Sequence, residues 1–225
     1  MKKIAIIPAK SFSRRLSNKN FRKIKNKTLV ELTLINLIKS KIFDEIHIST
    51  DNKNILKILK KYKMKHKFFR KKSLCNNNTG LNEVIKWTIN KYKEDYNLSF
   101  EIICLAYATA PLLNYKDFIQ ANKKFIRGDK KIPLISCCKY KPSVDEAMVL
   151  KGGKLNPVHK KKFFKDSLKH KDFFFETGGF IFFSKKYFES NKFINNQKFR
   201  PYVLPANKSL DIHTLQDLKM IKKFI

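Results

Sequence analysis

A basic segment carries the residues most suited to chemistry in this chain of 225 residues. It runs from Pro8 to Asn20 with the sequence PAKSFSRRLSNKN, directly after a short apolar run. Polyphosphates are bound by point charges and short hydroxyl donors, so this composition predicts a polyphosphate site, with a merely solvated basic loop as the alternative. The segment matches neither the GxxxxGKS/T loop nor the GxGxxG turn. Its cations, with one just beyond it, are Lys10, Arg14, Arg15, Lys19 and Arg22, and its hydroxyls are Ser11, Ser13 and Ser17.

The elements around this segment are predicted to place it at the end of a parallel strand. Lys3 to Ile7 is a continuous apolar run closed by a proline, typical of a strand buried on both faces. Alternating strands and helices then predict a single α/β domain, residues 1–225, with a mostly parallel sheet whose ligands gather at the carboxyl ends of the strands. Further strands are expected at 46–50, 101–107 and 132–138, and helices at 29–38, from 55 with Asp51 as its cap, at 81–96 and at 117–127.

After residue 140 the alternation loosens, and we expect an excursion from the domain at about 140–185. The KGGK sequence at 151–154 is a turn signal, and 173–183 is aromatic on both sides of a Gly-Gly pair. We predict a bent hairpin there that another subunit covers, because its phenylalanines would otherwise be exposed. The alternative is that they fold back onto their own sheet. Thr214 and Asp217 predict the start of a last helix.

Composition bounds the class of protein and its partners. Fifty Lys and Arg against eighteen Asp and Glu give a net charge of +32, so an anionic partner or substrate has to be considered. The bias toward 44 Lys over 6 Arg is also typical of an AT-rich genome, so a solvated surface is the favoured explanation of the charge. No apolar run approaches the about 20 residues of a membrane span, and the start lacks a signal-peptide core, so we expect a cytoplasmic protein. Four cysteines without CxxC spacing are expected as buried free thiols.

Four ordered segments resemble the cytidylyltransferases that make CMP-activated nine-carbon acidic sugars. Residues 8–20 resemble their signature PARxGSxRxxxKN, and 42–51 are similar to their second strand with its STD ending. Residues 105–112 look like the YATAP segment of the pseudaminic acid branch, and 211–218 resemble the segment DIDTPEDL. The resemblance covers essentially the whole chain and implies a Rossmann-like, three-layer nucleotidyltransferase fold.

This resemblance implies a reaction between CTP and an acidic nonulosonic sugar that yields a CMP-sugar and pyrophosphate with the help of Mg²⁺. Lys19 and Lys10 would neutralise charge on the leaving pyrophosphate and, with Asp211 and His213, form the catalytic set. The residues that the resemblance assigns to nucleotide binding are Ala9, Lys10, Ser13, Lys19, Asn20 and Arg70.

Asp211 matches the first acid of the family's carboxyl-end pair and would support the metal, since a carboxylate is a hard oxygen ligand for Mg²⁺. The second acid is replaced here by His213, and imidazole is a poor Mg²⁺ ligand. Three interpretations stay open. One carboxylate suffices with waters and phosphate oxygens, His213 accepts the sugar hydroxyl proton, or the protein is a weakened enzyme.

The resemblance places the acidic sugar at Tyr107 and Thr109, with Gly178 and Gly179 allowing the backbone to approach it. Ordinary core packing of the tyrosine and a plain hairpin turn explain the same residues. Family members pair through the segment beyond the central sheet, so a homodimer is expected. The alternatives to the enzyme are a non-catalytic member that binds CTP or a CMP-sugar and, less favoured because no RRM or C₂H₂ pattern is present, a nucleic-acid-binding protein. No membrane partner is expected.

Overall fold

Six strands form the central sheet of the computed structural model, which describes residues 1–13, 16–76, 78–166, 170–190 and 198–224. Their order across the sheet is β10-β6-β9-β5-β1-β4. β1 is parallel to β4 and β5, and β10 is parallel to β6, whereas β9 runs antiparallel between β5 and β6. The sheet is therefore mostly parallel, as predicted. The strands are β1 Lys3–Pro8, β4 Glu45–Ser49, β5 Ile102–Ala106, β6 Leu134–Lys139, β9 Phe174–Ser184 and β10 Arg200–Val203.

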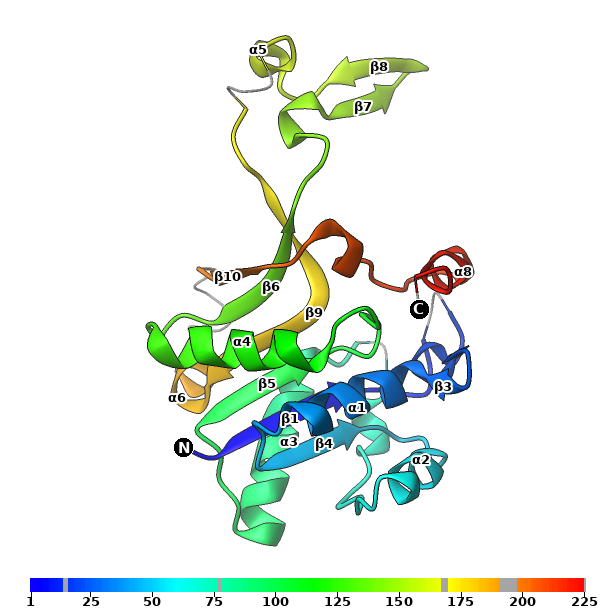
Figure 1. Cartoon of the computed structure of the whole chain (residues 1–225), viewed down its shortest axis with the longest axis vertical. Helices are drawn as coiled ribbons and strands as arrows, with labels where there is room; N and C mark the ends of the chain where they lie inside the picture. Colours follow the sequence, from blue (N-terminus) through cyan, green and yellow to red (C-terminus); the bar gives the residue numbers. More distant parts are fainter. Residues whose placement is uncertain (14–15, 77, 167–169, 191–197, 225) are drawn as a thin grey trace.

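Helices cover both faces of this sheet (Figure 1). Successive side chains of β1 point to opposite faces and pack against different helices. Ala5 and Ile7 pack into one apolar cluster with helices α1 and α4, while Ile4 and Ile6 pack into a second cluster with α3. A strand covered on both faces must be apolar throughout, which accounts for the continuous run. The three-layer α/β arrangement is confirmed. The helices are α1 Leu29–Ser40, α2 Ile55–Lys61, α3 Leu81–Tyr96, α4 Tyr115–Arg127, α5 Lys160–Phe163, α6 Lys185–Glu189 and α8 Leu215–Ile221.

The start of α8 agrees with the sequence pattern, whereas the start of α2 does not. Thr214 and Asp217 form a reciprocal capping box at α8, as predicted. The prediction that Asp51 caps the second helix is wrong, because α2 begins after Asn54. The basic loop passes over the end of β4, and the Asp51 carboxylate there accepts a hydrogen bond from the Ser11 backbone N–H at 2.8 Å. The Asp51 side chain, which the local pattern assigned to a helix cap, therefore accepts a hydrogen bond from a loop residue that is distant in the chain.

The aromatic segment that was expected to form a bent hairpin is the single strand β9. It pairs with β5 along one edge and with β6 along the other. Phe180, Phe182 and Phe183 are fully buried in the cores of their own chain, so cover by another subunit was the wrong prediction for them. The bend lies at Gly178, whose φ is 59°, where residues 177–180 lie opposite Ser136 alone. The Gly-Gly pair therefore belongs to a bulge that bends a strand.

β6 and β9 lead out of the sheet into a projection, residues 140–173, at the top of Figure 1. It carries the hairpin of β7 Met148–Lys151 and β8 Lys154–Pro157, which turns at Gly152 and Gly153 as the KGGK signal predicted, and the short helix α5. Almost every side chain of the hairpin is exposed. Elsewhere β2 Lys23–Ile24 and β3 Lys27–Thr28 form a second small ladder.

Two further sequence expectations concern thiols and membrane spans. Cys104, Cys137 and Cys138 are buried free thiols, as predicted, and Cys75 is half-buried. None of the helices in the described ranges combines the length and the apolar character that a membrane crossing requires.

A buried aromatic cluster packs against β4. His47 is 2% exposed, and its ring centroid lies 4.5 Å from that of Phe68 and 5.5 Å from that of Tyr92. Burial, followed by the charges of His66 and Arg70, lowers the pKa of His47 from 6.5 to about 3. Its Nε2 atom has no hydrogen-bond partner among the described residues. The folded protein therefore holds this histidine neutral at a pH where an exposed one is charged.

The free energy of unfolding should consequently fall as the pH falls through 6.5 toward 3. In that window the unfolded chain binds a proton at His47 that the folded chain does not bind, so acid favours unfolding. Between pH 7 and pH 5 the loss from this residue should be roughly 1–2 kcal/mol. Urea unfolding of the wild type and of His47→Phe at both pH values measures it, and the variant should lose less. Equal losses in the two proteins would contradict this role for His47.

Candidate active site

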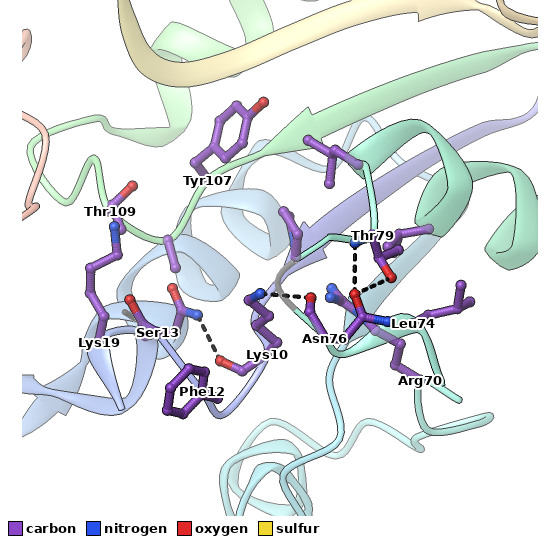
Figure 2. Close-up of a pocket in the computed structure, with 15 residues that line it drawn as sticks. Lys10, Phe12, Ser13, Lys19, Arg70, Leu74, Asn76, Thr79, Tyr107 and Thr109 are labelled. Atoms are coloured by element: carbon purple, nitrogen blue, oxygen red, sulfur yellow. Dashed lines mark hydrogen bonds between the residues drawn. The ribbon is translucent and has the colours of Figure 1, made fainter. Parts of the chain in front are cut away.

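The carboxyl ends of β1 and β5 lie at one cavity of about 260 Å³, and the end of β4 lies beside that of β1. The chain leaves β1 through Ala9, whose backbone N–H donates to the Ser49 carbonyl at the end of β4. The basic loop then forms one wall, residues 70–84 a second, and the end of β5 a third (Figure 2). The lining side chains include Lys10, Phe12, Ser13, Lys19, Asn20, Arg70, Leu74, Asn76, Thr79, Tyr107 and Thr109.

Lys10 connects two of these walls. Its Nζ donates to the backbone carbonyl of Asn76 at 3.1 Å, and its own carbonyl accepts from Nδ2 of the buried Asn20 at 3.2 Å (Figure 2). Ser13 lines the same cavity. The structure therefore brings together the nucleotide residues expected from this loop, while Arg14 and Arg15, also counted among its cations, lie outside the described residues.

Lys19 connects the basic loop to the carboxyl-end segment. A 3₁₀ turn, Lys19–Phe21, presents the side chain, and its Nζ donates to the Ile212 carbonyl at 3.0 Å. The Ile212 backbone N–H in turn donates to the Thr109 carbonyl at 3.0 Å. Figure 2 shows the Lys19 amino group beside Thr109. Since Asp211 precedes Ile212, the cation, the β5 end and the predicted metal carboxylate occupy one neighbourhood.

Arg70 forms a buried brace behind the cavity. Its guanidinium donates from Nε to the Ser49 hydroxyl at 3.0 Å and from Nη2 to the Ser49 carbonyl at 2.7 Å. Burial lowers the pKa of Arg70, and the acidic groups of Cys75 and Asp51 oppose that shift. The side chain lines the cavity as expected, but its hydrogen bonds are directed at β4, so contact with a nucleotide stays a prediction.

Asp211 and His213 are paired with each other. His213 Nε2 lies 2.9 Å from Asp211 Oδ2, while the backbone N–H of His213 donates to Asp217. The other carboxylate oxygen, Asp211 Oδ1, is buried and has no hydrogen-bond partner among the described residues. Those residues contain no group of three or more His, Cys, Asp or Glu side chains that could hold a metal by itself. The protein thus offers one oriented carboxylate oxygen rather than a complete metal cage.

The β9 bulge completes the side expected to bind the sugar. Gly178 packs so closely on Asp211 that a Cβ atom there would lie 2.6 Å from Oδ2. The Gly179 carbonyl accepts from the backbone N–H of Tyr107, whose ring points away from Lys10 in Figure 2. Desolvation, then the charges of Glu176 and Asp211, raises the pKa of Tyr107. Tyr107 and Gly178 therefore both lie near Asp211, although of these three residues only Tyr107 is among the described lining of the cavity.

Sequence reasoning missed three residues of this site. Asp51 holds the backbone of the basic loop, and Asn76 accepts the Lys10 ammonium. Glu176 faces Asp211, and partial desolvation followed by the Asp211 charge raises the pKa of Glu176. No local pattern in the sequence indicates these three contacts, because each joins distant parts of the chain.

The sequence itself matches known proteins over nearly its full length. Residues 4–146 match the family model described as Cytidylyltransferase. The pseudaminic acid cytidylyltransferase of Campylobacter jejuni is 31% identical over 223 residues, which are 99% of this chain and 95% of that protein. The CMP-N,N'-diacetyllegionaminic acid synthase of Legionella pneumophila is 23% identical over 229 residues, 100% of this chain and 97% of that protein.

Solved structures share the fold. CMP:2-keto-3-deoxy-manno-octonic acid synthetase complexed with CTP has a TM-score of 0.74 at 12% identity and covers 100% of this chain and 98% of its own. The 4-diphosphocytidyl-2C-methyl-D-erythritol synthase of Anaerococcus prevotii has a TM-score of 0.66 at 13% identity, covering 99% and 97%. At such identities the likeness concerns the fold, and it confirms the nucleotidyltransferase architecture.

Gly178→Ala should destabilise the protein more than the matched variant Gly152→Ala. Both glycines have positive φ, 59° and 57°, so each alanine pays roughly 1–2 kcal/mol for a left-handed backbone. No atom lies within 4 Å of a Cβ at Gly152, whereas a Cβ at Gly178 meets Asp211. Overpacking should add about 1–3 kcal/mol at Gly178. Urea unfolding measures the free energy of unfolding of both variants. Equal losses of stability would show that the Asp211 side chain moves aside at no cost in free energy.

Proposed function

The chain belongs to the cytidylyltransferase family, and from that premise we propose that it transfers CMP from CTP to an acidic nine-carbon sugar and releases pyrophosphate. The preferred acceptor is pseudaminic acid or a related nonulosonic acid. The observation that carries the proposal is the Lys19–Ile212 hydrogen bond, which holds Lys19, a residue that lines the cavity, against the segment that contains Asp211. Because CTP is a cytoplasmic metabolite, the reaction is assigned to the cytoplasm.

The relatives support the choice of sugar. A pseudaminic acid enzyme and a legionaminic acid enzyme both align with this chain from end to end. Residues 105–112 also follow the pseudaminic acid pattern at the β5 end, where Tyr107 and Thr109 line the cavity. Tyr107 would present its hydroxyl to the sugar as a hydrogen-bond donor, because a phenol is protonated at neutral pH and the raised pKa favours the same form.

In this reaction the anomeric hydroxyl of the sugar attacks the α-phosphorus of CTP in line with the departing pyrophosphate. Such a step needs positioning and neutralisation of charge more than covalent help from the protein. Lys19 and Lys10 would stabilise the charge that develops on the leaving phosphates, and Ser13 would add a short donor. Asn20 would hold the nucleotide from the loop side, together with the backbone around Ala9.

We assign a divalent cation, Mg²⁺, to Asp211, and one observation fits that assignment. Asp211 Oδ1 is buried, unpartnered among the described residues, and close to the segment that Lys19 contacts. Enzymes of nucleotides commonly hold Mg²⁺ by one or two carboxylates with phosphate oxygens and waters, so a single acid is enough. When bound, the cation would neutralise phosphate charge and orient the triphosphate. His213 would orient Asp211 through Oδ2, which keeps Oδ1 for the metal.

Purified protein with CTP, Mg²⁺ and pseudaminic acid should release pyrophosphate. Lys19→Ala should lower the rate at least about 100-fold, because removing one oriented charge donor costs about 3 kcal/mol of transition-state stabilisation. The matched control is Lys23→Ala, an exposed lysine of β2, which should keep the wild-type rate. A coupled pyrophosphate assay measures both, and chelation of Mg²⁺ should abolish the signal.

Several outcomes of that assay would speak against the proposal. Unchanged turnover in Lys19→Ala would contradict the assignment of Lys19 to a phosphate-binding site. CTP binding without turnover on pseudaminic, legionaminic or sialic acid would favour the alternative of a non-catalytic member, which rests on the His213–Asp211 contact. In that case His213→Asp should restore activity by supplying the family's second acid.

We also propose that the protein works as a homodimer that pairs through the projection. Monomeric proteins rarely expose large contiguous apolar patches, and the hairpin has little cover from its own chain. Leu150 and Leu155 lie opposite each other on β7 and β8 and are 69% and 62% exposed. Among the described residues of the projection, the other large apolar side chains that are exposed are Tyr140, Met148, Val149, Val158 and Phe164.

Light scattering at micromolar concentration should give twice the chain mass of 26.6 kDa. The double variant Leu150→Asp with Leu155→Asp should give a monomer, because four charges would be buried in the symmetric interface. Leu56→Asp, at an equally apolar but separate exposed position on α2, is the control and should remain dimeric. A wild-type mass of one chain would contradict the dimer.

A further inference from the structure

Asn76 occupies the wall of the cavity that faces the basic loop. Its Oδ1 atom accepts three hydrogen bonds, from the backbone N–H of Asn78 at 2.8 Å, from the backbone N–H of Thr79 at 2.8 Å and from the Thr79 hydroxyl at 3.0 Å. Its Nδ2 donates to the Ser73 carbonyl at 2.7 Å. The Asn76 side chain therefore links residues 73–76 to residues 78 and 79, together with a 3.4 Å hydrogen bond from the Thr79 hydroxyl to the Ser73 carbonyl. Figure 2 shows Asn76 between Lys10 and Thr79.

The backbone of Asn76 makes the connection across the cavity. Its carbonyl accepts the hydrogen bond from Lys10 Nζ at 3.1 Å, so the loop that Asn76 organises also sets the direction of that ammonium group. Thr79, which Asn76 holds by two bonds, lines the same cavity. Two opposite walls are thus joined through one residue.

Two backbone features hold the start of the segment that contains Asn76. Arg70 ties its start to the Thr50 carbonyl, and the 3₁₀ turn Lys72–Leu74 follows. Asn76 itself is exposed, so its bonds compete with water and contribute little to the folding free energy. These hydrogen bonds fix the shape of the cavity wall instead. The apparent dissociation constant of a nucleotide that needs this shape equals its intrinsic value divided by the fraction of time in which the wall keeps the shape.

We propose that Asn76 is a positioning residue that keeps residues 73–76, 78 and 79 and Lys10 in the nucleotide-competent arrangement before substrate arrives. The inference rests on the proposed function, since it assumes that the cavity accepts CTP. An asparagine suits this task because its amide both accepts and donates, whereas alanine would lose all four side-chain bonds. Serine would keep an acceptor for the backbone N–H groups, as in the turns that both residue types form.

The experiment compares CTP affinity and turnover in the wild type, Asn76→Ala, Asn76→Ser and Asn78→Ala. Asn76→Ala should raise the CTP dissociation constant measured by calorimetry without sugar, and the KM for CTP, about tenfold. The kcat should stay within about twofold, and the KM for the sugar and the melting temperature should not change. Asn76→Ser should restore part of the affinity. Asn78→Ala removes an exposed side chain but keeps the N–H that Asn76 accepts, so it should match the wild type.

The possible failures are distinguishable. Equal CTP affinity in the wild type and Asn76→Ala would overturn the inference and leave the proposed function intact. A parallel fall of kcat and melting temperature in Asn76→Ala would assign the residue a structural role and would also overturn it. Binding of CTP without turnover on any sugar would contradict the proposed function. A difference in CTP affinity between the wild type and Asn76→Ala would still support the role of Asn76. A wild type that binds no CTP would overturn both.

Discussion

The hydrogen bond from Lys19 to the Ile212 carbonyl joins two segments that are 193 residues apart in the chain, and the site depends on it. In the proposed function, one segment would supply cations and hydroxyls for a triphosphate, and the other would supply the carboxylate for a metal. Neither alone can bring phosphate charge and metal charge to one point. Parallel strands make the meeting possible, because β1, β4 and β5 end at the same edge of the sheet. The backbone bond from Ile212 to Thr109 then fixes the second segment to the β5 end.

Much of the fold follows from local pattern. β1 is apolar because both of its faces are covered, and the spacing of Val84, Ile85, Thr88 and Ile89 predicted α3, whose buried face contains these residues. The prediction failed where a distant partner decides the outcome. Asp51 had the right spacing for a helix cap, but the N–H of Ser11 takes its carboxylate. In β9 the aromatic residues carry no signal that separates a hairpin from a bulged strand, since the bulge is defined only by pairing with β6.

The residues of the site also fall into those that the sequence predicts and those that it does not. The basic loop was visible from residue types alone, because its position after an apolar strand places it at a ligand-binding edge. Asp211 was found only through resemblance, since a single acid near the carboxyl end of a chain has no pattern of its own. Asn76 and Glu176 could not be found by either route. Their importance arises from contacts with Lys10 and Asp211, and such contacts exist only after the sheet has formed.

The large positive charge and the small number of cations at the cavity have different consequences. A net charge of +32 creates a field that attracts CTP and an acidic sugar, and it raises association rates at low salt for any anion. That field carries no selectivity, since solvated lysines act at a distance and are screened within about 8 Å at physiological ionic strength. Among the described lining residues, only Lys10, Lys19 and Arg70 are cations, and each donates to a specific carbonyl of the protein. Selectivity must therefore come from these oriented groups, whose directions are fixed before the substrate enters. A mutation that leaves the net charge unchanged but frees one of them should lower kcat/KM for CTP more than the loss of several surface lysines does.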